Sequence, residues 1–437
     1  MEPCRKARLH SWIPGTARDE PDTPPMNLRP RFPEVMKHRD YRWYLIGVVI
    51  SQIGTQGTLV VMLYHMYELT GSTLQVGLVG AAQGIAIFLL SPIGGYFADR
   101  LDRKRLLQVS QGVSMLASLG VALVTLAGIV EPWHILLAVL INTAAAAFDR
   151  PVRRAVLPAL LPPEDLVRGV ALMNPVAEIS KLVGPALGGL FIAVGGPGLM
   201  YSVDAASFLA LIVIVAFLRI PHVQPEPNAM NFVSSIREGA RFVKDRPLIL
   251  HLLGLDLSAM IFAAYRVVLP ALTVEVLDVG PAGYGLLAAA PPLGALVGGV
   301  VVYRLVAVSA PAGRLVVAGT MSYGVSAVLL AQSNSLAMAL AAAAGLGVCD
   351  ALCTTLRHAG VLLATPDRLM GRVSALYSMS AQGGPALGDL QMGWLSGVLG
   401  VSAALTLGGL VPIFYAAAVG MWATTVREFR TEDERAL

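Results

Sequence analysis

Charged residues are scarce in this chain. Asp, Glu, Lys and Arg make up 14% of its 437 residues, whereas 55% are apolar. A soluble domain carries about 25% charged residues, and disordered or coiled-coil chains are also rich in charge. The composition therefore excludes these classes and indicates a membrane protein.

Cysteine is nearly absent as well. Cys4, Cys349 and Cys353 are the three in the chain, which excludes a disulfide scaffold. The last two are four residues apart in an apolar stretch without the histidines of a zinc site, so we interpret them as packing residues. No phosphate-binding loop and no nucleophile–base cluster is evident. We therefore expect no cofactor, no metal and no enzymatic activity.

Long apolar stretches recur along the chain, each close to the roughly 20 residues that cross a bilayer as a helix. The fold class that we predict is an all-α membrane protein with twelve transmembrane helices in two six-helix bundles. The expected spans are 44–67, 74–98, 106–129, 133–149, 169–193, 200–218, 248–273, 282–303, 314–332, 336–356, 373–398 and 402–425.

The same pattern divides the chain into five parts. We expect a disordered cytoplasmic tail at 1–42, an N-terminal bundle at 43–218, a cytoplasmic linker at 219–247, a C-terminal bundle at 248–426 and a cytoplasmic tail at 427–437. Apolar residues at helical spacing within the linker, from Phe232 to Val243, predict an amphipathic helix.

The cations support this arrangement. If the N-terminus is inside, 30 of the 32 Lys and Arg residues fall in tails and connections on the cytoplasmic side, and only Lys181 and Arg266 fall within spans. This distribution obeys the positive-inside rule and places both termini in the cytoplasm. The net charge of +4 therefore does not indicate a nucleic-acid partner.

An internal repeat relates the two halves. Gly-Pro-Ala-Leu-Gly occurs at 184–188 in the fifth predicted helix and again at 384–388 in the eleventh. The matching helix number indicates an internal duplication, as many transporters have. The glycines permit close helix packing, and the proline bends a helix. The residues of this packing motif are Gly184, Pro185, Gly188, Gly189, Gly384, Pro385 and Gly388.

The connection after the second predicted helix carries a spaced motif, Gly-Tyr-Phe-Ala-Asp-Arg-Leu-Asp-Arg-Lys at 95–104. It resembles the Gly-x-Leu-x-Asp-Arg-x-Gly-Arg-Lys motif of the major facilitator superfamily, with Asp102 in place of the second glycine. In that family the matching aspartate holds a cytoplasmic gate shut against the start of helix eleven. The resemblance therefore implies a cytoplasmic gate formed by Gly95, Asp99, Arg100, Arg103 and Lys104.

The chain resembles one branch of that superfamily more closely, the branch with the enterobactin exporter and the transmembrane secretion effectors. The similarity rests on Thr-Gly-Ser-Thr-Leu-Gln-Val-Gly at 70–77, Arg-Val-Val-Leu-Pro at 266–270 and Gly-Arg-Val at 371–373. The first pentapeptide of the repeat is also similar to the family's antiporter motif, with Ser180 in place of its first glycine. The resemblance implies outward transport of a siderophore, drug or secondary metabolite, and a location in the cytoplasmic (inner) membrane.

Charged residues within spans are expensive and therefore candidates for function. Glu178 and Lys181 share a helix face at i,i+3 and can form an ion pair. Asp389 breaks the internal symmetry, because Gly189 is its counterpart, so we favour it as the titrating carboxylate; pairing with Lys181 or Arg266 is its structural alternative. The candidate substrate and proton pathway comprises Gln52, Gln56, Glu178, Lys181, Asp256, Arg266 and Asp389.

We therefore predict a secondary active transporter that exports a small organic molecule by alternating access, with the reverse flow of protons supplying the energy. Its expected partners are that substrate, protons and membrane lipid, and we expect a monomer. An importer of lysophospholipid or another metabolite is the alternative on the same fold. A receptor or assembly partner that transports nothing is a second alternative.

Overall fold

The structure is a computed structural model of the chain, and it describes residues 34–98, 100–218, 241–306, 311–366 and 369–429. Most of both predicted tails, the linker up to residue 240 with most of its expected amphipathic helix, and the gate residue Asp99 lie outside the described residues. Within those ranges all regular structure is helical.

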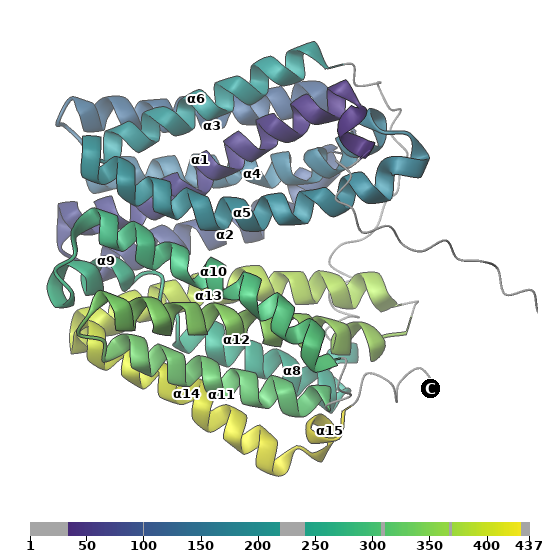
Figure 1. Cartoon of the computed structure of the whole chain (residues 1–437), viewed down its shortest axis with the longest axis vertical. Coiled ribbons are helices and arrows are strands. Elements are labelled where there is room, and N and C mark those ends of the chain that lie inside the picture. Colours follow the sequence, from purple (N-terminus) through teal and green to yellow (C-terminus); the bar gives the residue numbers. More distant parts are fainter. Residues whose placement is uncertain (1–33, 99, 219–240, 307–310, 367–368, 430–437) are drawn as a thin grey trace, which may run out of the picture.

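Six long helices build the N-terminal bundle (Figure 1). They are α1 (Arg39–Thr70), α2 (Thr73–Ala98), α3 (Arg103–Leu126), α4 (Pro132–Leu160), α5 (Pro163–Gly195) and α6 (Pro197–Phe217), preceded by the 3-10 turn η1 (Glu34–Lys37). Helix α1 starts inside the segment expected to be a tail, and α4 continues well beyond the predicted end at residue 149.

The C-terminal bundle has five long helices and one broken crossing. The broken crossing consists of α8 (Pro247–Leu257), the π-helical segment η2 (Ser258–Phe262), α9 (Leu269–Ala271) and a second π-helical segment, η3 (Leu272–Val276). It is followed by α10 (Gly280–Val306), α11 (Ala312–Ala331), α12 (Leu336–Leu363), α13 (Met370–Leu399), α14 (Val401–Trp422) and the short α15 (Thr424–Arg427).

Local sequence explains where several helices begin and end. Asp102 caps α3, because its side chain accepts a hydrogen bond from the Arg105 backbone N–H at 2.8 Å. Ser335 caps α12 in the same way through the backbone N–H of Met338. Gly71 ends α1 in the left-handed conformation at a φ of 60°, which glycine adopts without strain. The helix boundaries therefore follow ordinary capping chemistry.

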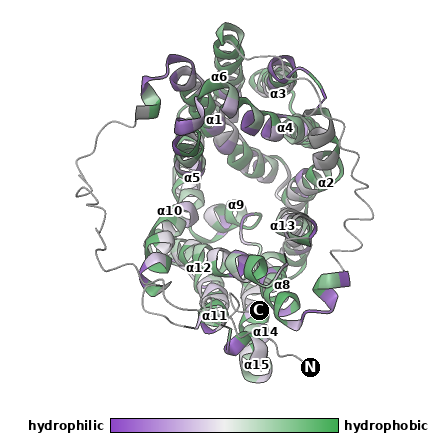
Figure 2. Cartoon of the chain, turned by 90° about the vertical axis from the view of Figure 1, so that its right-hand side faces the viewer, coloured by the Kyte–Doolittle hydropathy of each residue, from purple (hydrophilic) through white to green (hydrophobic). Residues whose placement is uncertain are grey.

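The surface matches a membrane environment. Ten helices in the described ranges are long and apolar enough to cross a membrane, and the segment Pro247–Phe262 is apolar but shorter. Large apolar side chains on the bundle flanks are exposed, among them Leu116, Phe217, Leu387 and Trp422, and apolar colour dominates the outer helix faces in Figure 2. Such an apolar surface needs lipid around it, so the chain is a multi-pass membrane protein.

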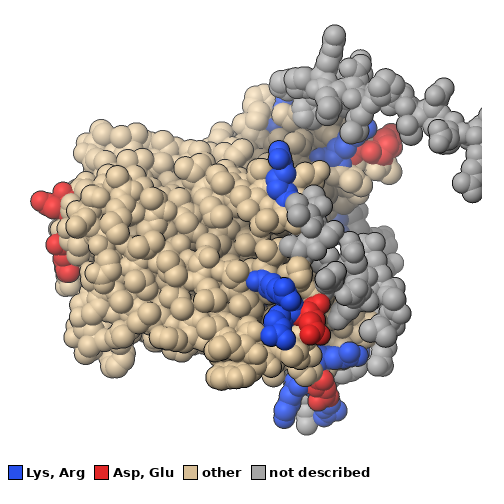
Figure 3. Space-filling view, turned by 60° about the horizontal axis from the view of Figure 1, so that its bottom comes forward, with Lys and Arg blue, Asp and Glu red and all other residues tan. Residues whose placement is uncertain are grey.

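Charges gather at the two ends of the helices (Figure 3). The end where Lys and Arg concentrate, with Arg100, Arg103, Lys104, Arg304 and Arg314, is called the basic end below. The opposite end, with Glu68, Glu131, Glu275 and Asp278 on the connections there, is called the acidic end. The connections at the acidic end contain no Lys or Arg.

The two bundles meet through equivalent helices. α2 packs against α13, and α5 packs against α10, which is the pairing expected of two related halves. A Cβ atom on Gly77 of α2 would lie 3.2 Å from the Cα atom of Gly393 on α13, and one on Gly189 of α5 would lie 2.7 Å from the backbone nitrogen of Gly285 on α10. The glycines therefore allow the bundles to touch backbone to backbone near the acidic end.

The apolar core is shared at one end and divided at the other. One buried cluster contains residues of both bundles, such as Val61, Met66, Val268 and Leu287, toward the acidic end. Toward the basic end the N-terminal bundle has its own cluster, and the C-terminal bundle has two more. In Figure 1 the bundles correspondingly converge at the end where α9 lies and diverge toward the end where α1 begins and α15 lies.

Candidate functional site

A cavity of about 300 Å³ lies among the C-terminal helices and is completed by α5 of the N-terminal bundle. Five of the seven predicted pathway residues line it, namely Glu178, Lys181, Asp256, Arg266 and Asp389. Two prolines of α10 and residues of α11, α12 and α13 form the rest of its wall. The structure therefore brings together charged side chains that lie more than 200 residues apart in the sequence.

Pro270 explains why the seventh crossing is broken beside this cavity. Proline has no backbone N–H, and its ring collides with the carbonyl group four residues earlier, which here belongs to Arg266. Residues 263–268 are accordingly not helical, and Tyr265 and Arg266 line the cavity from this irregular segment. The continuous helix predicted over 248–273 is therefore wrong. Broken helices at membrane depth are tolerated where they line a cavity, and they commonly form transport sites.

Arg266 and Asp389 form an ion pair at the contact between the bundles. The Arg266 Nη2 atom donates to Asp389 Oδ2 at 2.7 Å, and the Asp389 side chain is only 2% exposed. Across the interface the carboxylate faces Gly80 of α2, where a Cβ atom would lie 2.7 Å from the Asp389 Cγ atom. A movement that separates α2 from α13 therefore changes the surroundings of this carboxylate directly.

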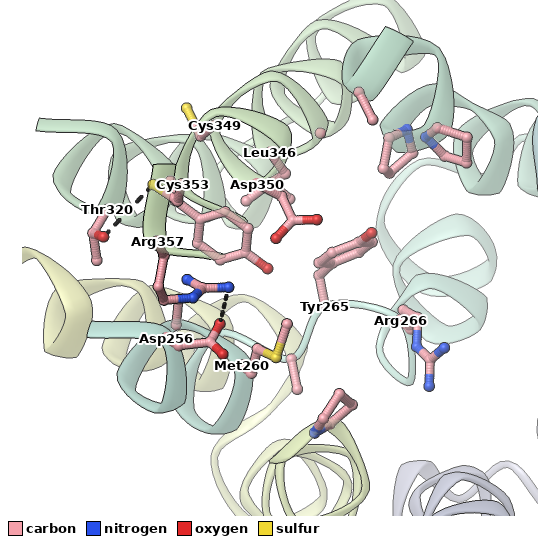
Figure 4. A pocket seen from close by; sticks show the side chains of 18 of the residues that line it. Asp256, Met260, Tyr265, Arg266, Thr320, Leu346, Cys349, Asp350, Cys353 and Arg357 are labelled. Carbon is pink, nitrogen blue, oxygen red and sulfur yellow. Dashed lines mark hydrogen bonds and ion pairs between the residues drawn. The ribbon is translucent and has the colours of Figure 1, made fainter. Parts of the chain in front are cut away.

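Asp256 pairs with Arg357 of α12, a residue expected from the sequence to lie in a cytoplasmic connection. The Arg357 Nη2 atom lies 2.8 Å from Asp256 Oδ1, and the two side chains are 3% and 2% exposed. Arg357 also lies over the Tyr377 ring, a cation–π contact. Placing Arg357 in a loop was wrong because α12 continues to Leu363. Figure 4 shows this pair on the cavity wall opposite Tyr265 and Arg266.

Two further carboxylates face the cavity with different surroundings. Glu178 Oε1 lies 2.7 Å from Lys181 Nζ, and both side chains are substantially exposed. Asp350 is exposed and accepts a weak hydrogen bond from Thr354 at 3.4 Å. In the described part of the chain no Lys or Arg lies within ion-pair distance of it. The cavity thus contains three ion pairs and, among the described residues, one carboxylate without a cation.

Gln52 and Gln56 are not among the described residues that line the cavity. Both are partly buried on α1, and the Cβ atom of Gln56 packs closely on Gly184 of α5. Their predicted position along the substrate pathway stays a prediction.

Their neighbour Ser51 instead belongs to a buried polar network in the N-terminal bundle. Gln111 donates to Asp149 Oδ1 at 2.7 Å, Arg153 pairs with Asp149, and Arg153 Nη2 donates to Ser51 at 3.2 Å. Residues 150–168 were expected to form a cytoplasmic connection, and the length of α4 corrects that expectation.

Parts of the predicted gate are described. Arg103 donates to the Ala155 carbonyl at 3.0 Å near the end of α4, and Lys104 donates to the carbonyls of Ala216 and Leu218 at the end of α6. Cations at helix C-termini are favourable because the helix dipole is negative there. Gly95 belongs to α2 and Arg100 to the turn that follows it. The gating role of these residues stays a prediction.

The repeated glycine–proline motif packs in equivalent places. Gly184 and Gly188 lie against α1, where a Cβ atom on Gly188 would be 3.0 Å from the Gly57 carbonyl oxygen. Gly384 and Gly388 lie against the broken seventh crossing, where a Cβ atom on Gly388 would be 3.0 Å from Ala264 Cβ. Pro185 and Pro385 are inside α5 and α13, respectively. Helices five and eleven therefore use the same residues against helices one and seven.

Two bundles of membrane-crossing helices with a charged cavity between them define a transporter of the major facilitator fold. Solved structures share this fold at low identity. A bacterial homolog of the human lysosomal transporter Spinster, in an inward-facing and unoccupied conformation, is 14% identical with a TM-score of 0.71 over 90% of this chain and 98% of that one. A mutant of the peptide transporter POT is 12% identical with a TM-score of 0.74 over 89% and 95%.

The chain belongs to the transmembrane secretion effector family, whose profile matches residues 34–437. Among curated relatives, the enterobactin exporter EntS of Salmonella choleraesuis (strain SC-B67) is 28% identical over 363 residues, which cover 83% of this chain and 86% of the relative. EntS of Shigella boydii serotype 18 is 27% identical over 384 residues, covering 88% and 91%. The similarity therefore extends over both bundles.

Several members of the site, among them Arg357, Tyr265 and Tyr323, were not predicted from the sequence. Asp350, Cys353 and Arg357 follow a spacing of i, i+3 and i+7, which places them on one face of a helix, so a longer tenth predicted helix would have brought Arg357 into the membrane. No sequence pattern predicted Tyr265, because it faces the cavity only where the helix is broken at residues 263–268.

Proposed function

We propose that this protein exports a small organic molecule, such as a siderophore, drug or secondary metabolite, across the cytoplasmic membrane in exchange for protons. The observation that carries the proposal is the charged cavity lined from both bundles. The names of the relatives as enterobactin exporters support the outward direction. The positive-inside rule supports a cytoplasmic basic end with both termini on that side.

Contacts between the bundles at the acidic end support alternating access. The Tyr67 hydroxyl of α1 donates to Glu275 of η3, and the Tyr284 hydroxyl of α10 donates to the Val60 carbonyl at 2.9 Å. The Tyr64 and Tyr284 rings lie 5.1 Å apart. In this proposal these contacts close the cavity toward the acidic end. Rocking of the bundles would break them and form others at the basic end.

The ion pairs suggest how a proton and a substrate exchange. A proton on Asp389 removes the counter-charge of Arg266, and a substrate oxygen then takes its place beside the guanidinium group. The Glu178–Lys181 pair can act in the same way on the opposite wall. Asp389 or Glu178 thus exchanges the proton in this proposal, while Arg266 or Lys181 contacts the substrate.

Asp350 favours a substrate that also carries a positive group. The cavity is lined by three cationic and four carboxylate side chains, so it holds one negative charge in excess when all are ionised. Tyr265 and Tyr323 also line it, and aromatic faces attract ammonium groups. We expect Asp350→Asn to weaken binding of a cationic substrate by about tenfold, or 1.4 kcal/mol, the scale of one charge-assisted hydrogen bond. Equal effects on cationic and neutral substrates would contradict this assignment.

Proteoliposomes test the function as a whole. Purified protein is reconstituted in one orientation with a pH-sensitive dye inside, and it is challenged with a catecholate siderophore, a quaternary ammonium drug, a lysophospholipid and a sugar. We expect one class to cause proton movement opposite to its own, with Asp389→Asn or Glu178→Gln abolishing it. Asp278→Asn is the matched control, because Asp278 lies at the acidic end away from the cavity in a left-handed conformation that asparagine tolerates.

Two results would overturn the proposal. Lysophospholipid accumulating inside intact cells would identify an importer. Folded, correctly oriented protein that moves neither substrate nor protons would favour a receptor or assembly partner.

A further inference from the structure

A second carboxylate site lies inside the N-terminal bundle, away from the cavity. Asp204 of α6 is 1% exposed, and Ser118 of α3 donates to its Oδ2 atom at 2.8 Å. On the other side Gly54 of α1 is so close that a Cβ atom there would lie 2.8 Å from Asp204 Oδ1. The carboxylate is therefore enclosed by three helices.

No positive charge balances this carboxylate among the residues that the structure describes. The side chains that face it are the hydroxyls of Ser118, Thr58 and Ser207, from α3, α1 and α6. This distinguishes Asp204 from Asp149, Asp256 and Asp389, the other nearly buried carboxylates, each of which pairs with an arginine. An ionised carboxylate buried without a partner is highly unfavourable in a membrane protein.

Two buried oxygen atoms at the Asp204 site lack a hydrogen-bond partner. Asp204 Oδ1 and the neighbouring Thr58 Oγ1 are both buried without a hydrogen-bond partner. The side chain of Asn142 joins the cluster by donating to Ser118 at 3.4 Å. A single proton on Asp204 Oδ1 would neutralise the carboxylate and supply a donor to Thr58. The Thr58 hydroxyl can satisfy the acceptor by donating to it, but among the described residues only a bound proton would balance the charge.

We propose that Asp204 is a proton-binding site that is occupied in the conformation described here and exchanges its proton during transport. The step is a simple protonation: the carboxylate oxygen gains one proton from water and returns it to water. One turn nearer the acidic end, the Tyr201 hydroxyl of α6 and His65 Nδ1 of α1 are hydrogen-bonded at 3.1 Å, and Glu68 lies exposed beyond them. These polar groups mark the side from which the proton enters.

The coupling part of this inference rests on the proposed function, because proton exchange with a substrate requires transport. The occupancy part does not. It can be tested on the purified protein without any substrate, so failure of the two ideas can be distinguished.

Infrared spectroscopy of the intact protein tests occupancy. A protonated carboxyl group has a carbonyl stretching band that a carboxylate lacks. We expect the wild-type protein to show such a band at neutral pH, and Asp204→Asn, which preserves shape, to lose it. Asp278→Asn should retain the band. An unchanged band in Asp204→Asn would overturn the proposal.

A second variant covers the possibility that Asp204→Asn does not fold. Ser118→Ala removes the hydroxyl that donates to Asp204, so the band should remain but shift in frequency. An unshifted band would assign it to another group and refute the site.

Transport then tests the coupling. Asp204→Asn should reduce substrate flux driven by a pH gradient by about tenfold, within the usual range of coupling between two sites. Counterflow of substrate without a gradient should stay within about twofold of wild type, because the cavity is untouched. Equal losses in both assays would show a structural role and overturn the coupling.

Discussion

The buried pair of Asp256 and Arg357 makes the sharpest energetic prediction. Replacing Asp256 by asparagine keeps the shape of the side chain but leaves Arg357 charged and only 3% exposed. At the observed 2.8 Å, opposite unit charges attract by about 6 kcal/mol at an effective dielectric constant of about 20. Much of that attraction only offsets the desolvation of the two groups, so the observable quantity is the loss when one partner is removed.

We expect Asp256→Asn and Arg357→Gln each to lower the free energy of unfolding by about 3–5 kcal/mol, the usual effect of breaking a buried pair. The double substitution should cost clearly less than the sum, because two neutral amides leave no unbalanced charge. Asp256 Oδ2 and Arg357 Nε already lack partners, which places the expected values at the lower end of this range.

Unfolding in mixed detergent micelles, followed by tryptophan fluorescence, would measure these free energies. The Glu178–Lys181 pair is the matched control, since its side chains are 38% and 48% exposed and Glu178→Gln should cost at most about 1 kcal/mol. Strictly additive losses in the double mutant, or equal losses at both pairs, would refute the reasoning.

Two further predictions concern the contact between the bundles. Gly80→Ala should separate α2 from α13, because its Cβ would collide with Asp389. The yield of cysteine cross-linking between the bundles at the acidic end should therefore fall. Gly112→Ala is the control, because a Cβ there has nothing within 4 Å, and it should leave the cross-linking yield unchanged. Tyr67→Phe removes the hydroxyl that donates to Glu275 and should raise labelling of the cavity from the acidic end by about fivefold, or 1 kcal/mol, the worth of one hydrogen bond. Unchanged labelling in Tyr67→Phe would show that this bond does not hold the bundles together.

Much of the fold could be predicted because apolar length and charge placement are properties of single segments. The twelve-helix architecture follows from hydropathy and from the repeated pentapeptide, and the fold comparison confirms that class. The helix ends were harder to predict. Arg153 and Arg357 resemble loop cations in the sequence, because nothing in a linear pattern says that a buried carboxylate will accept them.

The site was predictable in part for the same reason. Burial in the membrane is costly for any charge, so Asp256, Arg266 and Asp389 could be selected without knowing their partners. Which charges pair depends on tertiary contacts, and the pairing of Asp389 with Arg266 was one of two alternatives. Pro270 accounts for the break at Arg266, but a proline in an apolar run can equally kink a continuous helix.

The broken seventh crossing also has a mechanical consequence. Its first half is tied to α12 of its own bundle through Asp256 and Arg357, whereas its second half is tied to α1 of the other bundle through Glu275 and Tyr67. Residues 263–268 are not helical, so the two halves do not form one continuous rod. The second half can therefore change its angle to the first when the bundles separate at the acidic end, and the torsion is absorbed at Tyr265 and Arg266, where the cavity is lined.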